Sequence, residues 1–182
     1  MKMKRQFGSV VLCTLLFVIP VALQAADDWS VVKSHEGNFK VILPGESDYS
    51  SSKVDTDVGQ IDLHTFAVEA NGGSVAYFVF YSDYPEGTEE DTDPTELLQN
   101  ARDGVVGEGS RQTREEKITI GDGHPGLEFD FVQGTGAEKT YGYWRLYMVK
   151  NRLYQIGIIS IGEPAVDYKV KTIYGSFDLI NK

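Results

Sequence analysis

Three tyrosines and one arginine occupy alternate positions of a single apolar segment: Tyr141, Tyr143, Arg145 and Tyr147. Tyr and Arg are residue types in which binding energy concentrates, because each joins a large flat surface to hydrogen-bonding groups. Alternate positions of a strand point to the same face of a sheet. We therefore predict a binding surface at these four residues. The competing interpretation is that the rings pack beneath a helix, and that Arg145 stacks among them or pairs with an acidic residue.

A second candidate is the acidic segment 83–93, since carboxylates are the ligands that calcium prefers. Its acidic residues are Asp83, Glu86, Glu89, Glu90, Asp91 and Asp93. The segment lacks the spaced Asp/Asn residues, the glycine and the closing glutamate of a calcium-binding loop. Part of its charge is explained by a helix start, where the helix dipole favours carboxylates. We expect a solvated loop, with weak cation binding as the alternative.

Metal and catalytic chemistry have few other candidates. His35, His64 and His124 have no second histidine at metal-ligand spacing, and Cys13 is the only cysteine. A site shared by His64 and Asp62 would need loops to bring the two together. No Gly-x-Ser-x-Gly segment is present, and the glycines at 104–109 follow a helix, so they cannot cradle a phosphate at its start. We predict a protein that is not an enzyme, with no catalytic residue, cofactor or metal centre.

The Tyr/Arg residues lie in the first arm of a predicted hairpin, residues 141–160. Two apolar runs are interrupted once, at Lys150, Asn151 and Arg152, and Asn tolerates the left-handed backbone of a tight turn. One register groups the following residues on one face: Trp144, Leu146 and Met148 with Tyr154, Ile156 and Ile158. The Tyr/Arg residues then occupy the other face. A shift of one residue would exchange the faces, so burial is expected to fix the register.

The hairpin is expected to lie in a sheet that is covered on both sides. Residues 61–70 and 74–82 carry apolar residues at both parities, which is typical of strands buried on both faces. Helices are predicted from Asp93, with a stripe of Leu97, Leu98, Ala101 and Val105, and from Glu163, with a stripe of Val166, Val170, Ile173 and Tyr174. We predict an α+β fold, namely an α/β/α sandwich whose central antiparallel sheet has helices on both faces.

Two further segments bear on the sheet. Residues 47–59 are rich in Ser and Asp and are expected to form an exposed loop. In residues 127–131, Glu128 and Asp130 alternate with apolar side chains. That alternation predicts a strand whose Glu128 and Asp130 face water.

The N-terminus has the pattern of a cleaved signal peptide, residues 1–25. Lys2, Lys4 and Arg5 precede an apolar run at 10–18, which is short for a membrane span. Loss of these three basic residues and no acidic ones changes the net charge from −10 to −13. So acidic a surface disfavours nucleic acid and anionic lipid as partners. We expect a periplasmic or secreted protein with no membrane span after cleavage, comprising one domain at 26–182.

The order of several motifs resembles the PsbP-like family. The segment GNFKVILPG (residues 37–45) resembles its opening signature, and ITIGDGHPGLEF (118–129) is similar to a motif of small secreted bacterial members. Arg145 to Tyr147, Leu153-Tyr154 and the closing SFDL (176–179) match in order. The resemblance implies an α/β/α sandwich and a binding function. Plant and cyanobacterial members of the family sit on the lumenal face of photosystem II.

These observations predict a non-enzymatic, exported accessory or binding protein of the bacterial cell envelope, a monomer that docks to a larger protein assembly. The alternative is a carrier of a small ligand or a divalent cation. It would use the acidic loop 83–93 or the Tyr/Arg strand.

Overall fold

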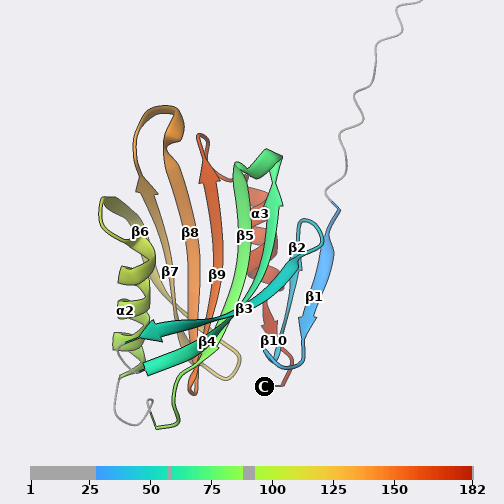
Figure 1. The fold of residues 1–182 in the computed structure, drawn as a ribbon, viewed down its shortest axis with the longest axis vertical. Coiled ribbons are helices and arrows are strands. Elements are labelled where there is room, and N and C mark those ends of the chain that lie inside the picture. The colour runs from blue at the N-terminus through green and yellow to red at the C-terminus, as the bar shows by residue number, and fades with distance from the viewer. Residues whose placement is uncertain (1–27, 57–58, 88–92, 182) are drawn as a thin grey trace, which may run out of the picture.

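The computed structural model describes residues 28–56, 59–87 and 93–181, and most of these residues lie in two antiparallel sheets (Figure 1). The large sheet has seven strands in the order β3-β4-β5-β9-β8-β7-β6, and the small sheet has three in the order β1-β2-β10. The strands of the large sheet are β3 (Asp48–Thr56), β4 (Gly59–Ala70), β5 (Val75–Asp83), β6 (Ser110–Ile120), β7 (His124–Gln133), β8 (Thr140–Val149) and β9 (Arg152–Ile161). Those of the small sheet are β1 (Ser30–Ser34), β2 (Phe39–Leu43) and β10 (Asp178–Leu179).

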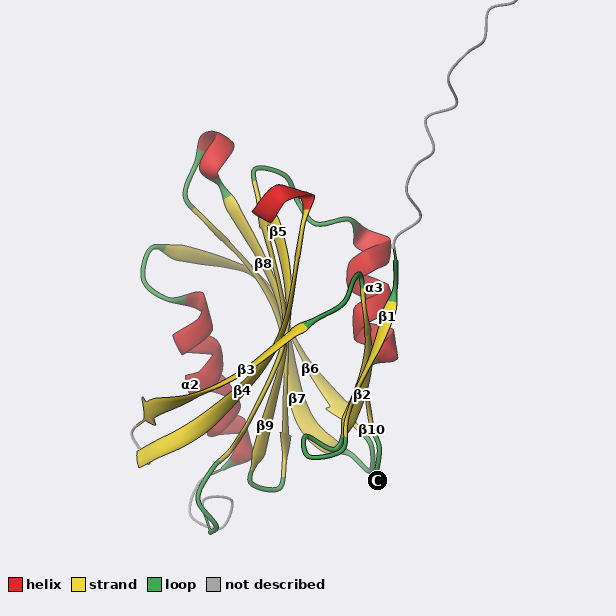
Figure 2. Ribbon diagram, turned by 45° about the vertical axis from the view of Figure 1, so that its right-hand side comes forward, coloured by secondary structure: helices red, strands yellow, loops and turns green. Residues whose placement is uncertain are grey.

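The predicted α/β/α sandwich is wrong, because the described chain is mostly strand and has only two α-helices. Helix α2 (Pro94–Val106) packs on one face of the large sheet, over β7 and β8. The small sheet lies on the opposite side together with α3 (Asp167–Ser176), as Figure 2 shows. The N-terminal strands and β10 therefore cover part of a face for which the sequence pattern predicts helices alone.

The two helices begin and end for local reasons. At α2, the Asp93 carboxylate accepts a hydrogen bond from the Thr95 backbone N–H at 2.8 Å, Pro94 fills the first turn, and Gly107 (φ 63°) ends the helix. This confirms the predicted start and apolar stripe. Helix α3 begins at Asp167, four residues after the predicted start, and Val166 remains extended and exposed.

The β8–β9 hairpin forms as predicted, but in the other register. Val149 pairs with Arg152 across the two-residue turn at Lys150 and Asn151, and Trp144 faces Gly157. Tyr154, Ile156 and Ile158 therefore share a face with the Tyr/Arg residues rather than with Trp144. A Cβ at position 157 would overlap the indole of Trp144, so the glycine makes room for that ring.

Residues 48–56 form the edge strand β3 and are not the predicted loop. Its Ser- and Asp-rich sequence suits an edge strand because most of its side chains are exposed. The polar composition reflects the exposure of these side chains. The segment forms a strand because its backbone pairs with β4.

The large sheet separates two apolar cores. One lies between the sheet and α2 and includes Leu98, Phe129, Trp144 and Leu146. The other lies between the two sheets and is centred on Phe39, whose ring contacts those of Phe66, Tyr81, Tyr154 and Phe177. Even positions of β8 thus face α2, and odd positions face α3 and the small sheet.

The predicted signal peptide falls on residues 1–25, which lie outside the described residues. Neither α2 nor α3 has the length and apolar character needed to cross a membrane, and no other described helix has them.

Candidate functional site

The candidate site is a cleft of about 570 Å³ between α3 and strands β6, β7 and β8, called here the α3 cleft. From the sheet it is lined by Arg114, Glu128, Asp130, Tyr143 and Arg145. From the α3 side it is lined by Ala165, Asp167, Val170, Lys171, Tyr174 and Gly175. Three neighbouring strands supply the charged floor because the same parity of each strand points to this side of the sheet.

A buried carboxylate joins two arginines in the floor of the cleft. The Glu128 side chain is 8% exposed. Its two oxygens accept hydrogen bonds from the guanidinium groups of Arg114 and Arg145, one on either side. Pairing with two cations offsets the cost of burying this carboxylate and fixes the position of both arginines. Glu128 therefore organises the site without facing water, contrary to the prediction for this strand.

Arg145 also attaches the floor to α3. Its Nη1 donates to the backbone carbonyl of Tyr174 at 3.3 Å, and its guanidinium lies 4.3 Å from the centroid of the Tyr174 ring. This cation–π contact joins β8 to the last turn of the helix. The Tyr174 hydroxyl is buried and has no hydrogen-bond partner among the described residues. Burial, and next the charge of Glu128, raise the pKa of Tyr174 well above its ordinary value.

Asp130 is a second, more accessible carboxylate on the same wall. Its Oδ2 lies 3.8 Å from Nη1 of Arg114, beyond hydrogen-bonding distance. Burial is the main cause that raises the pKa of Asp130, and the charge of Glu128 adds to it while Arg114 opposes it. Asp130 is therefore next to a cation without being fully engaged by it.

The walls of the cleft are partly apolar. Tyr143 is half-buried on the sheet side, and Ala165 and Val170 line the helix side. Burial raises the pKa of Tyr143, and a hydrogen bond with the backbone of Ala165 opposes that shift. The rim pair Lys171 and Asp167 is joined at 2.7 Å and is largely exposed. An arrangement of fixed charges of both signs beside aromatic and aliphatic walls suits recognition of a small polar molecule or side chain.

Two of the four predicted binding residues, Tyr143 and Arg145, line the cleft. Tyr147 is buried and stacks on Phe177, with ring centroids 5.9 Å apart. Tyr141 lies outside the cleft, with Lys139 Nζ 4.7 Å from its ring centroid. The four residues thus share a face of the sheet but do not form one site.

Sequence reasoning missed Arg114, Glu128 and Tyr174. Glu128 and Asp130 were assigned to water because charged residues alternated with apolar ones. The pattern that could have identified the site is a pair of opposite charges at matching positions of adjacent strands. Glu128 and Arg145 form such a pair, because they are direct neighbours in the β7–β8 pairing.

The ends of the acidic segment 83–93 already have protein partners. Both carboxylate oxygens of Asp83 accept hydrogen bonds from Arg152 at 2.6 Å, and Asp93 caps α2. Residues 88–92 lie outside the described residues. Within the described ranges, no group of three His, Cys, Asp or Glu side chains is close enough to hold a metal ion. His64 instead stacks on Tyr81, with ring centroids 4.3 Å apart, and its Nδ1 hydrogen-bonds with the Tyr49 hydroxyl at 2.8 Å.

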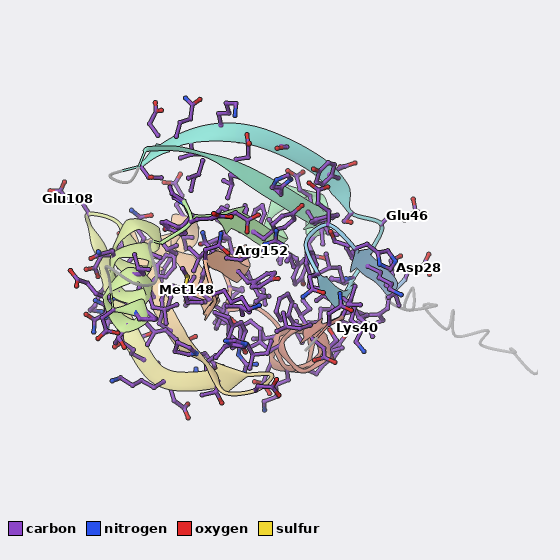
Figure 3. All side chains as sticks on the ribbon, turned by 90° about the horizontal axis from the view of Figure 1, so that it is seen from below. Asp28, Lys40, Glu46, Glu108, Met148 and Arg152 are labelled. Carbon is purple, nitrogen blue, oxygen red and sulfur yellow. The ribbon has the colours of Figure 1, made fainter. Side chains whose placement is uncertain are left out.

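Arg152 does not line the α3 cleft, and its contacts lie between the two sheets. Besides Asp83, it donates to the Glu36 carbonyl at 2.7 Å and lies 4.9 Å from the Tyr81 ring centroid. In Figure 3, the view from below, the Arg152 label lies near the centre of the picture, whereas Asp28, Glu46 and Glu108 are labelled near the outline. Arg152 therefore connects the large sheet to the β1–β2 turn and holds the two sheets together.

The large antiparallel sheet, flanked by one helix on one side and by a helix with a small sheet on the other, defines a PsbP-like fold. The solution structure of cyanobacterial PsbP (CyanoP) from Synechocystis sp. PCC 6803 matches it with a TM-score of 0.52, over 89% of this chain and 98% of that chain, at 10% sequence identity. This likeness confirms the predicted resemblance at the level of the fold.

A protein of unknown function, PA94 from Pseudomonas aeruginosa, matches with a TM-score of 0.33 and 9% identity over 79% of this chain and 86% of that chain, which is too distant to carry weight. No protein-family model and no curated protein matches the sequence.

Proposed function

We propose that this chain is a non-enzymatic accessory protein that is exported to the periplasm or secreted. It docks to a larger protein assembly of the bacterial cell envelope through the side that carries α3. The PsbP-like fold supports an accessory role, and the pattern of residues 1–25 supports export. The acidic surface favours a partner with basic residues at the contact.

The observation that carries the docking surface is the distribution of exposed apolar side chains. Five large ones are exposed among the described residues: Val31, Tyr49, Ile161, Val166 and Tyr168. Val166 and Tyr168 flank Asp167 at the start of α3. At the C-terminal end of α3, Val31 lines a groove together with residues 175–178. Three of the five thus lie along α3, beside a cleft that offers charged groups. Apolar contacts surrounded by polar ones are typical of protein interfaces.

Site-specific photo-crosslinking in intact cells tests this surface. A photoreactive amino acid at Val166 or Tyr168 is expected to capture one defined partner, which is then identified by mass spectrometry. The same amino acid at Gln99 or Asn100, exposed positions of α2, is the matched control. Substitution of Val166→Glu should abolish the crosslink from position 168 without changing the circular dichroism spectrum. Equal capture from both helices, or none from α3, would contradict docking through α3.

Export is tested separately by cell fractionation. The tagged full chain is expected in the periplasm or medium, shortened by the mass of its first 25 residues. A chain that stays in the cytoplasm at full length would contradict export.

The alternative function, a small-ligand carrier, is favoured by the α3 cleft, whose volume lies in the range of ligand pockets. The divalent-cation version is weakened because Asp83 and Asp93 are already engaged. Unchanged melting temperatures with calcium, manganese and zinc would exclude that version.

A further inference from the structure

We propose that the α3 cleft binds a small zwitterion of the α-amino acid type. Its carboxylate contacts the guanidinium groups of Arg114 and Arg145, its ammonium contacts Asp130, and its apolar side chain lies against Val170. This ligand class goes beyond the docking function and does not depend on it.

The floor of the cleft offers guanidinium N–H donors to a carboxylate. Two guanidinium groups share the single buried carboxylate of Glu128. Arg114 has five N–H donors, of which three form the hydrogen bonds found among the described residues, two to Glu128 and one to Glu116. Its side chain is 42% exposed and that of Arg145 is 25% exposed, so both are accessible from the cleft. Arginine recognises carboxylates well because its donors are held in a planar fork.

A carboxylate, that of Asp130, lies next to the Arg114 guanidinium in the cleft. Asp130 is 24% exposed, and its carboxylate is 3.8 Å from the Arg114 guanidinium, too far for a hydrogen bond. An α-amino acid carries its ammonium and carboxylate on the same carbon, so its two charges match an adjacent acid and base. A simple anion would leave Asp130 facing it, and a simple cation would face the arginines.

The overall charge of the protein points the same way. The mature chain is strongly acidic, and such a surface opposes the approach of a plain anion. A zwitterion has no net charge and is not repelled. The walls formed by Tyr143, Ala165 and Val170 fit its apolar part, and the cleft volume of about 570 Å³ lies in the range of small-molecule pockets.

A purely structural ion network is the simpler explanation, and two observations go against it. First, the cleft beside the network (about 570 Å³) is much larger than the pocket between α2 and strands β6 and β7 on the other side of the sheet (about 200 Å³). Second, the Tyr174 hydroxyl beside the network is buried without a partner, although buried polar groups in finished cores are nearly always satisfied. A bound water, ion or small molecule is one explanation for a buried polar group that has no protein partner.

Isothermal titration of the purified, dialysed protein tests the ligand class. The probes are L-leucine and L-phenylalanine, each compared with its deaminated acid (isocaproate, hydrocinnamate) and its decarboxylated amine (isoamylamine, phenethylamine). We expect saturable binding of at least one amino acid. Its deaminated acid and its decarboxylated amine should each bind with an affinity at least roughly tenfold lower. Equal binding of the acid alone would overturn the role of Asp130, and no binding of either amino acid would overturn the ligand class.

Variants then locate the site. Asp130→Asn and Arg114→Gln should each weaken amino acid binding by roughly tenfold, the loss expected for one charge-assisted contact. Arg102→Gln is the matched control, because Arg102 also pairs with acidic residues but on the α2 side, at Asp103 and Glu115. Its affinity should equal that of the unmodified protein. If Arg114→Gln fails to fold by circular dichroism, Asp130→Asn alone decides, and unchanged affinity in it overturns the site.

Discussion

The two faces of strands β7 and β8 differ sharply although they are built from alternating residues of the same segments. On the α2 face, Phe129, Trp144 and Leu146 pack with the helix into a closed apolar core. On the α3 face, their neighbours Glu128 and Arg145 form ion pairs, and α3 leaves a cleft beside them. Figure 3 shows Met148, the next residue of the apolar row, between the sheet and α2.

The difference teaches that, along this part of β7 and β8, the α2 face is packed for stability and the opposite face offers accessible charged groups beside α3. An apolar face gains free energy from each buried side chain and favours complete packing. Charged residues lose hydration when covered, so they are retained only with partners and at the edge of an open space. The α3 cleft follows from that constraint. The comparison predicts larger effects of substitution at the apolar residues of β7 and β8 that face α2 than at the charged residues on the opposite face.

The largest effect is expected from Phe129→Ala on the α2 face. Phe129 is fully buried, and truncation removes its apolar contacts and leaves a cavity, at a cost of about 3–5 kcal/mol in the free energy of unfolding. Urea unfolding followed by circular dichroism measures it. A loss below about 1 kcal/mol would show that packing of Phe129 in the α2 core contributes little to stability.

An intermediate effect is expected from Glu128→Gln on the α3 face. The variant leaves two guanidinium groups without their shared counter-charge, and we expect a loss of about 1–3 kcal/mol, less than for a fully buried pair because both arginines are partly exposed. Glu116→Gln is the control, since Glu116 also contacts Arg114 (3.4 Å) but is 64% exposed. Its cost should be below about 0.5 kcal/mol. Equal costs in the two variants would mean that burial of Glu128 is unimportant.

The same substitution, Tyr to Phe, should change the free energy of unfolding in opposite directions at two buried tyrosines. Tyr174→Phe removes a hydroxyl with no partner and should stabilise the unliganded protein by up to about 1 kcal/mol. Tyr154→Phe removes a hydroxyl that donates to the Gly37 carbonyl at 2.7 Å and should cost about 1 kcal/mol. Urea unfolding of both variants gives the comparison. Destabilisation by Tyr174→Phe would indicate that its hydroxyl is satisfied in solution.

Much of this architecture was predictable from the sequence because local chemistry determines it. The cap at Asp93, the apolar stripe of α2 and the β8–β9 turn depend on neighbouring residues, and each appeared where expected. The fold class was not predictable in this way. Apolar residues on both faces of a strand show that it is covered, but a helix and a second sheet cover it equally well. The pairing of β10 with β2 joins residues far apart in the chain, and no local pattern indicates it.

The site was predicted only in part for the same reason. Tyr143 and Arg145 were found because they share one strand with an unusual composition. Glu128 was misassigned to water because its burial depends on arginines of two other strands, β6 and β8. Register, too, depended on a tertiary contact, the packing of Trp144 over Gly157. Periodicity identifies which residues share a face but does not show what lies opposite that face.

The smallest effect, and the most specific to the cleft, is expected from Asp130→Asn. Burial raises the pKa of Asp130 above its value in the unfolded chain, so the folded state favours the protonated form. This contribution to stability is fully present below the unfolded pKa and is lost as the pH rises through the folded pKa. At about pH 7 the ionised carboxylate is therefore slightly unfavourable, and the neutral amide should raise the free energy of unfolding by less than about 1 kcal/mol.

The pH dependence separates this effect from a change in packing. Below about pH 3 the carboxyl is protonated in both states, so the variant and the unmodified protein should have the same stability. Urea unfolding across the acidic range measures the difference. A gain that persists at low pH would arise from packing, and a loss at neutral pH would mean that the attraction to Arg114 outweighs burial. In that case Asp130 would belong to the structural ion network, and the two faces of the sheet would differ less than the geometry of the cleft implies.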